Sequence, residues 1–180
     1  MQRRFPLWCS VLCAAASLGC TAVNQSPATQ APRLRTLTND RIGYSLSYPR
    51  AWRIAAKVVA TQFAARTRCQ TVRVVDRAGL AEVRQSFVQL CWKPINDGSS
   101  LDGFMRSTYG SRLGQLFMRA SLGGVPAYRT KTGSTNRTFF VQTKKGYRLQ
   151  ILTAVVAAPT KRRIRIAQVN RILASLSFTR

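Results

Sequence analysis

The sequence predicts an α+β fold, in which one mostly antiparallel β-sheet is covered by helices as an α-β-α sandwich. Several segments after residue 40 alternate apolar and polar residues, a period of two that is typical of half-buried strands. Glycine-containing turn signals separate neighbouring strand segments, as in β-hairpins. Two further segments, near 100–116 and 160–176, repeat their apolar residues at helical spacing instead. Strands in hairpin order with two separate helices are typical of this fold class.

The first twenty residues have the pattern of a secretory signal. Arg3 and Arg4 form a basic start, an uncharged apolar run follows over 5–18, and Gly19-Cys20 ends it. This run is shorter than the roughly 20 apolar residues that cross a hydrocarbon core. No later segment of the sequence is long and apolar enough to do so. We therefore expect residues 1–19 to be a signal peptide that directs export and is then removed.

Cys20 distinguishes a lipid-anchored protein from a plainly secreted one. The segment Ala16-Ser17-Leu18-Gly19-Cys20 resembles a bacterial lipobox, in which a cysteine after a small residue is acylated and becomes the mature N-terminus. The alternative is an ordinary signal peptide cut nearby, with Cys20 incidental. The run over 21–32 is polar, uncharged and contains proline, so it would serve as a flexible tether. We therefore expect lipidation of Cys20.

The expected organisation is a lipid-anchored tether over 20–40 and one folded domain over 41–180, a length that suits a single core. This places the protein outside the cytoplasm, anchored to the cell envelope on its periplasmic or other extracytoplasmic face. In a cyanobacterial host the corresponding compartment would be the thylakoid lumen.

The domain is expected to open with a strand that ends at Pro49. The apolar residues that alternate along this strand are Ile42, Tyr44, Leu46 and Tyr48. Trp52 follows the turn and is large enough to fill one end of a core. Residues 52–66 are ambiguous, with strand-like stretches at 57–60 and 62–65.

A hairpin with a disulfide across it is expected next. Its strands alternate around Val72 and Val88, and Arg77-Ala78-Gly79 supplies the turn signal. If Cys69 lies opposite Cys91, the apolar residues of both strands share one face, whereas a one-residue slip separates them. The cysteine register and the hydrophobic register therefore agree independently. We predict a Cys69–Cys91 disulfide, because disulfides persist in an oxidising compartment; two free buried thiols are the alternative.

The second half of the domain is expected to contain two helices and four strands. Ser100 is the expected N-cap of the first helix, with Asp102 in its first turn. The residues at helical spacing after this cap are Leu101, Phe104, Met105, Thr108 or Tyr109, Leu113 and Leu116. The strand pairs are 117–121 with 125–131 and 137–143 with 147–156. Thr160 is the expected N-cap of the last helix, whose apolar stripe is Ile166, Val169, Leu173 and Leu176.

Four short motifs resemble those of PsbP-like domains. In Gly43-Tyr44-Ser45-Leu46-Ser47-Tyr48-Pro49-Arg50-Ala51-Trp52 a strand ends in an aromatic residue and proline, with tryptophan three residues later. The other matching segments are Gly124-Val125-Pro126-Ala127, Lys145-Gly146-Tyr147 and Ser175-Leu176-Ser177-Phe178. The resemblance covers about 41–178 and implies an α-β-α sandwich that acts as a docking module without chemistry of its own. This chain lacks the acidic and histidine residues linked to metal ions in the photosystem II members, which puts a role in oxygen evolution in doubt.

The sequence disfavours the common catalytic and metal-binding arrangements. It contains no histidine, which removes Ser-His-Asp and Cys-His catalysis and histidine-based zinc sites. Its five acidic residues are scattered singly, whereas calcium and magnesium need several oxygen ligands together. We therefore expect a protein that is not an enzyme and holds no metal and no cofactor.

Positive charge is the strongest compositional feature of the chain. It has 29 basic and 5 acidic residues, a formal net charge of +24. Without Arg3 and Arg4, 27 basic residues against 5 acidic ones leave +22. Such a field favours anionic partners. Basic residues occur in nearly every segment, so an abundance of arginine spread over the surface is the alternative explanation.

A basic cluster lies in the first turns of the last helix. Positive charge is unfavourable there, because the N-terminal end of a helix is the positive end of its dipole. The cluster is either an anion-binding end that faces lipid headgroups or an acidic partner, or an ordinary solvated face. With two lysines of the preceding hairpin turn, the anion-binding candidates are Lys144, Lys145, Lys161, Arg162, Arg163 and Arg165.

Two functions follow from these observations. The first is an accessory or docking lipoprotein on a membrane protein complex or envelope component, photosystem-associated if the host is photosynthetic. The second is a polyanion-binding module for anionic lipid or an acidic polymer. The expected partners are the membrane, through the N-terminal lipid, and an acidic protein or anionic lipid surface. Nucleic acid is disfavoured, because export separates the protein from most of it and no stacking aromatic residues lie among the basic ones.

Overall fold

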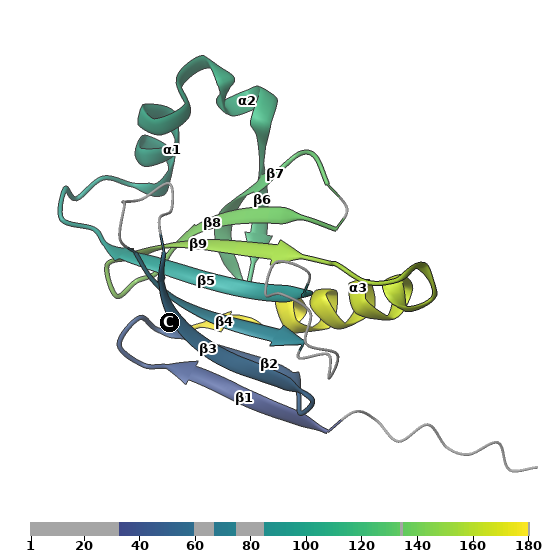
Figure 1. Ribbon diagram of the computed structural model, residues 1–180. Helices are drawn as coiled ribbons and strands as arrows, with labels where there is room; N and C mark the ends of the chain where they lie inside the picture. Colours follow the sequence, from purple (N-terminus) through teal and green to yellow (C-terminus); the bar gives the residue numbers. More distant parts are fainter. Residues whose placement is uncertain (1–32, 60–66, 75–84, 134, 180) are drawn as a thin grey trace, which may run out of the picture. The chain divides into compact units, whose positions relative to one another are not determined.

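The structure, a computed structural model, describes residues 33–59, 67–74, 85–133 and 135–179. The described strands form a seven-stranded sheet of order β3-β4-β5-β9-β8-β7-β6 and a three-stranded sheet of order β1-β2-β10 (Figure 1). The strands of the large sheet are β3 (Trp52–Val59), β4 (Thr67–Val74), β5 (Phe87–Pro94), β6 (Phe117–Leu122), β7 (Val125–Thr130), β8 (Arg137–Gln142) and β9 (Tyr147–Ala154). Those of the small sheet are β1 (Leu34–Asn39), β2 (Tyr44–Pro49) and β10 (Ser177–Phe178). Every pairing is antiparallel.

Helices cover both faces of the large sheet. Successive residues of a strand point to opposite faces, and β8 shows this directly. Its Phe139 packs in the main core with the helix α3 (Pro159–Ala174), whereas the next residue, Phe140, packs with α1 (Leu101–Tyr109). A short 3₁₀ turn (Gly110–Arg112) and α2 (Leu113–Leu116) follow α1. The predicted α+β class, with a mostly antiparallel sheet covered by helices, is confirmed.

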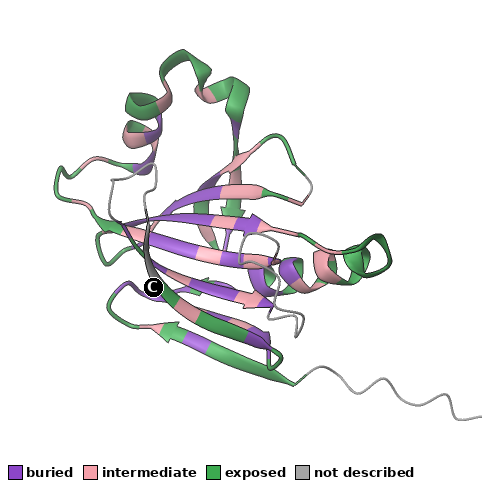
Figure 2. Cartoon of the chain, in the orientation of Figure 1, coloured by how far each residue is buried: buried purple, intermediate pink, exposed green. Residues whose placement is uncertain are grey.

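The main core lies between the large sheet, the small sheet and α3. Buried and half-buried positions alternate along the first part of β5, whereas β8 and β9, which are covered on both faces, contain runs of consecutive buried residues (Figure 2). The predicted inward residues of the first expected strand, Ile42, Tyr44, Leu46 and Tyr48, are all buried in this core. Trp52 is 1% exposed and is among the largest fully buried side chains, as its predicted place at one end of a core requires.

The small sheet was not anticipated, because its first strand falls in the segment expected to be a tether. β1 (Leu34–Asn39) pairs along its whole length with β2, from Leu34 opposite Pro49 to Asn39 opposite Tyr44. The boundary expected at residue 40 is therefore too late, and the folded part includes Leu34. Only Leu37 of this strand is buried, so its sequence carries almost no alternation.

Two helix boundaries differ from those expected. The first helical stripe does not run through to Leu116, because α1 ends at Gly110, whose positive φ of 53° leaves the helical region. Thr160 is not the N-cap of the last helix. Ala158 holds that position without a side-chain hydrogen bond, and the helix starts with proline at its first turn. By contrast, Ser100 caps α1 as predicted, its Oγ accepting a hydrogen bond of 3.1 Å from the Gly103 amide.

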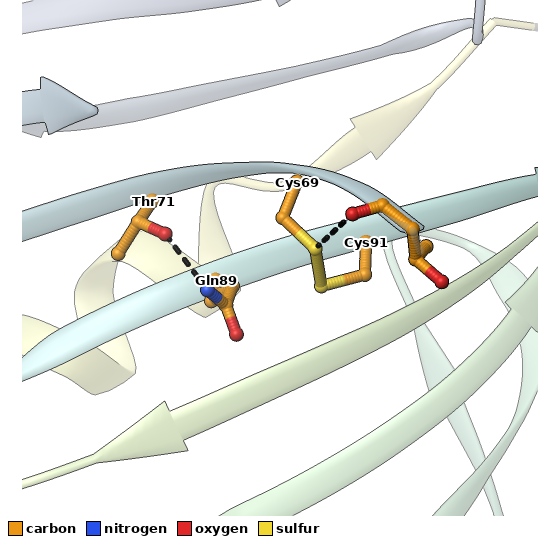
Figure 3. Close-up of a disulfide and its surroundings, with 5 residues drawn as sticks. Cys69, Thr71, Gln89 and Cys91 are labelled. Carbon is orange, nitrogen blue, oxygen red and sulfur yellow. Dashed lines mark hydrogen bonds between the residues drawn. A yellow bond between two sulfur atoms is a disulfide. The ribbon is translucent and has the colours of Figure 1, made fainter. Parts of the chain in front are cut away.

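The β4–β5 hairpin has the predicted register and the predicted disulfide. Cys69 lies directly opposite Cys91, and Val72 lies opposite Val88. The two cysteines are joined by an S–S bond and are at most 1% exposed. Figure 3 shows the bridge beside a cross-strand hydrogen bond of 3.0 Å from Gln89 to Thr71, on the face of the sheet opposite Val72. The turn predicted at 77–79 lies outside the described residues.

A buried arginine on the same face of the large sheet holds the start of α1. The Arg148 guanidinium donates to the carbonyl oxygen of Ser99 at 3.0 Å and to its hydroxyl at 2.8 Å. Its Cζ also lies 4.2 Å from the ring centroid of Phe104. Asp97 is 3.8 Å away and stays largely exposed. Burial lowers the pKa of Arg148, while hydrogen bonds from Ser99 lower the pKa of the Asp97 carboxyl.

Candidate anion-binding site

A pocket of about 350 Å³ opens at the end of the domain where β5 ends and β9 begins. We call it the end pocket. Three of its lining residues are basic and none is acidic. Its lining residues are Arg41, Thr67, Arg68, Trp92, Lys93, Pro94 and Tyr147.

The aromatic wall of the end pocket is held from behind by polar contacts between the two sheets. The ring of Trp92 lies 6.5 Å from that of Tyr44, centroid to centroid, in a tilted arrangement. The Tyr44 hydroxyl donates to the Gln70 side-chain oxygen, which also accepts from the Asn39 amide at 3.3 Å. Burial raises the pKa of Tyr44, so this hydroxyl keeps its proton and remains a donor. These contacts fix the inner side of Trp92, which is itself half-buried.

The turn between β1 and β2 brings Arg41 to the pocket. Asn39 closes this turn by accepting hydrogen bonds from two backbone amides, that of Ile42 at its side chain and that of Gly43 at its carbonyl. Gly43 has a φ of 83°, a conformation that favours glycine. From this position the Arg41 Nε donates to the Tyr147 hydroxyl at 3.2 Å. One exposed cation is thereby attached to the pocket's second aromatic residue.

A neighbouring turn adds charge at the same end. The Lys145 ammonium donates to the Asp40 carbonyl oxygen at 2.7 Å, which links the β8–β9 turn to the β1–β2 turn. Lys144 is exposed beside it. Two of the predicted anion-binding candidates therefore lie near the turn that carries Arg41, but neither is a lining residue of the end pocket.

Basic residues outnumber acidic ones at this end, although the β1–β2 turn also carries the exposed Asp40. Arg41 and Arg68 are exposed, and neither has a carboxylate within ion-pair distance among the described residues. The ion pairs that do form elsewhere join Arg119 to Asp102 and Arg148 to Asp97. Cations without nearby acids attract anions, and aromatic walls add apolar contact. The end pocket is thus suited to an anion that carries an apolar group.

The fold is similar to that of a PsbP protein. The solution structure of cyanobacterial PsbP (CyanoP) from Synechocystis sp. PCC 6803 matches 87% of this chain and 98% of its own, with 12% sequence identity and a TM-score of 0.49. No family model and no curated protein matches the sequence.

The remaining anion-binding candidates lie at the opposite end of β9. Lys161, Arg162 and Arg163 are exposed in the first turn of α3, and Arg165 donates to the Gln168 side chain at 2.9 Å. β9 separates this turn from the β8–β9 turn, and its eight residues span roughly 26 Å. Figure 1 shows the first turn of α3 and the β1–β2 turn at different ends of the domain. The six candidates are therefore two groups and not one. Cys20, the predicted lipidation site, lies outside the described residues.

Sequence reasoning missed most of the end pocket. The register that placed Cys69 opposite Cys91 also places Arg68 opposite Trp92, so one step along the predicted ladder could have revealed this pair. The contact between Arg41 and Tyr147 had no comparable signal, because 106 residues separate them and β1 was not recognised.

The described part of the chain has neither a cluster of metal ligands nor a membrane-spanning helix. No group of three or more cysteine or acidic residues there could hold a metal ion. No helix in the described ranges is long and apolar enough to cross a membrane.

Proposed function

We propose that this protein is an exported, lipid-anchored docking protein whose folded domain binds an acidic partner of the cell envelope through the end pocket. The observation that carries the proposal is the pairing of unmatched cations, Arg41 and Arg68, with the aromatic walls formed by Trp92 and Tyr147. Interfaces are enriched in arginine, tryptophan and tyrosine, which supply most of the binding energy when they surround a pocket.

Three features support this location and role. The Cys69–Cys91 disulfide fits an oxidising compartment outside the cytoplasm. The signal-like start and the lipobox-like Cys20 supply export and an anchor. The sequence motifs resemble PsbP-like domains, for which docking on a larger membrane assembly is the implied role. If the host is photosynthetic, a photosystem is an assembly of this kind.

A second candidate function is the binding of a polyanion, either anionic lipid or an acidic polymer. It is favoured by the first turn of α3, where Lys161, Arg162 and Arg163 are exposed and acidic residues are absent. Ile164 in the same turn is 59% exposed, and Val156 just before the helix is 40% exposed. Basic residues around exposed apolar ones suit a lipid surface.

The test is a pull-down from detergent-solubilised envelope membranes of the host, with the mature lipidated protein as bait. The variant Arg41→Gln/Arg68→Gln removes two charges at the end pocket, and Lys161→Gln/Arg162→Gln removes two at α3. We expect wild-type bait to capture a membrane protein. The Arg41→Gln/Arg68→Gln variant should no longer capture it, whereas the Lys161→Gln/Arg162→Gln variant should still do so.

Other outcomes discriminate between the two functions. Equal loss in both variants, with capture that falls steeply as salt rises, would favour a diffuse polyanion interaction over docking. Loss only in the α3 variant, together with weaker binding to anionic vesicles, would replace the docking proposal by lipid binding.

A further inference from the structure

We propose that the end pocket recognises one apolar side chain flanked by carboxylates, so that the partner presents an acidic segment with an embedded aromatic or large aliphatic residue. The inference rests on the proposed docking function and specifies the chemistry of the segment that binds. Two sets of residues carry it, the apolar walls of the pocket and the cations at its rim.

The walls define the apolar half of the ligand. Trp92, Pro94 and Tyr147 present two rings and a proline to a space of about 350 Å³. This is at the small end of the range for ligand pockets, which run from about 300 to 1,000 Å³. A single side chain fits such a space, and aromatic walls favour a ring by offset or edge-to-face stacking. An inorganic anion alone would leave these walls without contact.

The rim defines the charged half of the ligand. The Arg41 Nε is already engaged by the Tyr147 hydroxyl, which holds the guanidinium beside the pocket. Among the described residues, no hydrogen bond or ion pair occupies its two terminal nitrogens, and they are spaced to bind a carboxylate with two parallel hydrogen bonds. Arg68 lies on the other side, directly opposite Trp92 on the neighbouring strand. Arg41 and Arg68 therefore lie on two sides of the end pocket, which suits a ligand with a carboxylate on each side of the inserted apolar residue.

The basic lining of the end pocket disfavours a positively charged ligand. Because three of the lining residues are basic and none of them is acidic, a cationic side chain would be repelled by the lining. A neutral apolar segment would bury its side chain but leave the rim arginines unpaired, so the gain from their charge would be lost. The acidic, ring-bearing segment is the chemistry that uses every wall of the pocket.

The experiment measures tryptophan fluorescence of the protein without residues 1–19, which contains only Trp52 and Trp92, during titration with short blocked peptides. The probe contains Asp-Phe-Asp, and its two matched controls contain Asn-Phe-Asn and Asp-Ser-Asp. We expect saturable binding of the first peptide and at least ten-fold weaker binding of each control. The fluorescence change should disappear in Trp92→Phe, because the mature chain's other tryptophan, Trp52, is fully buried.

Variants assign the charged contacts. Arg41→Gln and Arg68→Gln should each weaken the Asp-Phe-Asp peptide about ten-fold, whereas Arg112→Gln, an exposed cation remote from the pocket lining, should leave its affinity unchanged. Thermal unfolding of every variant checks that it is folded. We expect Arg41→Gln and Arg68→Gln to stay folded, because both arginines are exposed.

Three results would overturn the inference. The first is equal affinity for Asp-Ser-Asp and Asp-Phe-Asp, the second is displacement of the probe by equimolar inorganic phosphate, and the third is absence of peptide binding while the membrane pull-down still succeeds. The third result would leave the docking function standing. Specific peptide binding by a protein that captures nothing from membranes would instead reject the docking function and keep the pocket.

Discussion

Arg148 and Arg119 show how differently two ion-paired arginines contribute to one domain. The Arg148 side chain is 6% exposed and contacts Ser99 and Phe104 as well as Asp97. The Arg119 side chain is 72% exposed and pairs with Asp102, which is 43% exposed. Exposed pairs contribute little, because water and salt screen them and two long side chains are ordered. In Arg148 the hydrogen bonds to Ser99 and the contact with the Phe104 ring dominate, since Asp97 is distant and exposed.

We predict that Arg148→Ala lowers the free energy of unfolding by about 3 kcal/mol, because it removes two charge-assisted hydrogen bonds and a cation–π contact from a buried site. Arg119→Ala should cost less than about 1 kcal/mol. Urea denaturation followed by circular dichroism gives both values. Arg148→Lys should fall between them, because an ammonium keeps the charge but not the planar donor pair. Equal losses in Arg148→Ala and Arg119→Ala would contradict this ranking.

The β4–β5 hairpin is the element that sequence analysis described best, and β1 is the one it missed. In the hairpin, the positions of Cys69 and Cys91 and the apolar pattern around Val72 and Val88 fix the register independently. β1 offers neither constraint, because most of its residues are exposed and it is held by backbone pairing with β2. A strand at a sheet edge with one buried side chain has too weak a pattern to recognise.

The same contrast explains what could be predicted of the candidate site. Lys144 and Lys145 are recognisable from the sequence as basic residues in a hairpin turn, and in the structure Lys145 contacts Asp40, the neighbour of Arg41. The basic first turn of α3 was also recognised, but its separation from that hairpin turn depends on the direction of β9 and could not be read from local spacing. The contact between Lys145 and Asp40 joins residues 105 apart in sequence, and such contacts follow only from the packing of the two sheets.

Loss of the disulfide is predicted to destabilise the domain by about 3 kcal/mol, the chain-entropy value for a loop with a sequence separation of 22. The measurement is urea denaturation of the oxidised protein against Cys69→Ala/Cys91→Ala. As a control, reductant should lower the denaturation midpoint of the wild type and leave that of the double variant unchanged. In the oxidised protein, Cys69 and Cys91 should also resist alkylation, because a disulfide leaves no thiol to react. A double variant as stable as the oxidised wild type would refute the prediction.

At the scale of the whole molecule, charge repulsion opposes folding. The chain carries 29 basic residues against 5 acidic ones, so most cations lack a nearby carboxylate. A compact state brings these charges together, and salt screens them over a Debye length of about 10 Å at 0.1 M. Stability should therefore depend on ionic strength more than in a protein of balanced charge.

We predict that the melting temperature rises by several degrees between about 20 mM and 500 mM sodium chloride, as screening weakens this repulsion. Differential scanning calorimetry provides the measurement. Lys161→Gln/Arg162→Gln/Arg163→Gln should melt higher than wild type at low salt and gain less from added salt. A melting temperature that falls or stays constant with sodium chloride would show that repulsion is unimportant.

The direction of β1 separates the start of the folded part from the end pocket. The strand begins at Leu34, opposite Pro49, and ends at Asn39, opposite Tyr44 and next to the turn that carries Arg41. Its six residues extend over about 20 Å. The backbone therefore enters the small sheet about 20 Å away from the turn that brings Arg41 to the recognition surface.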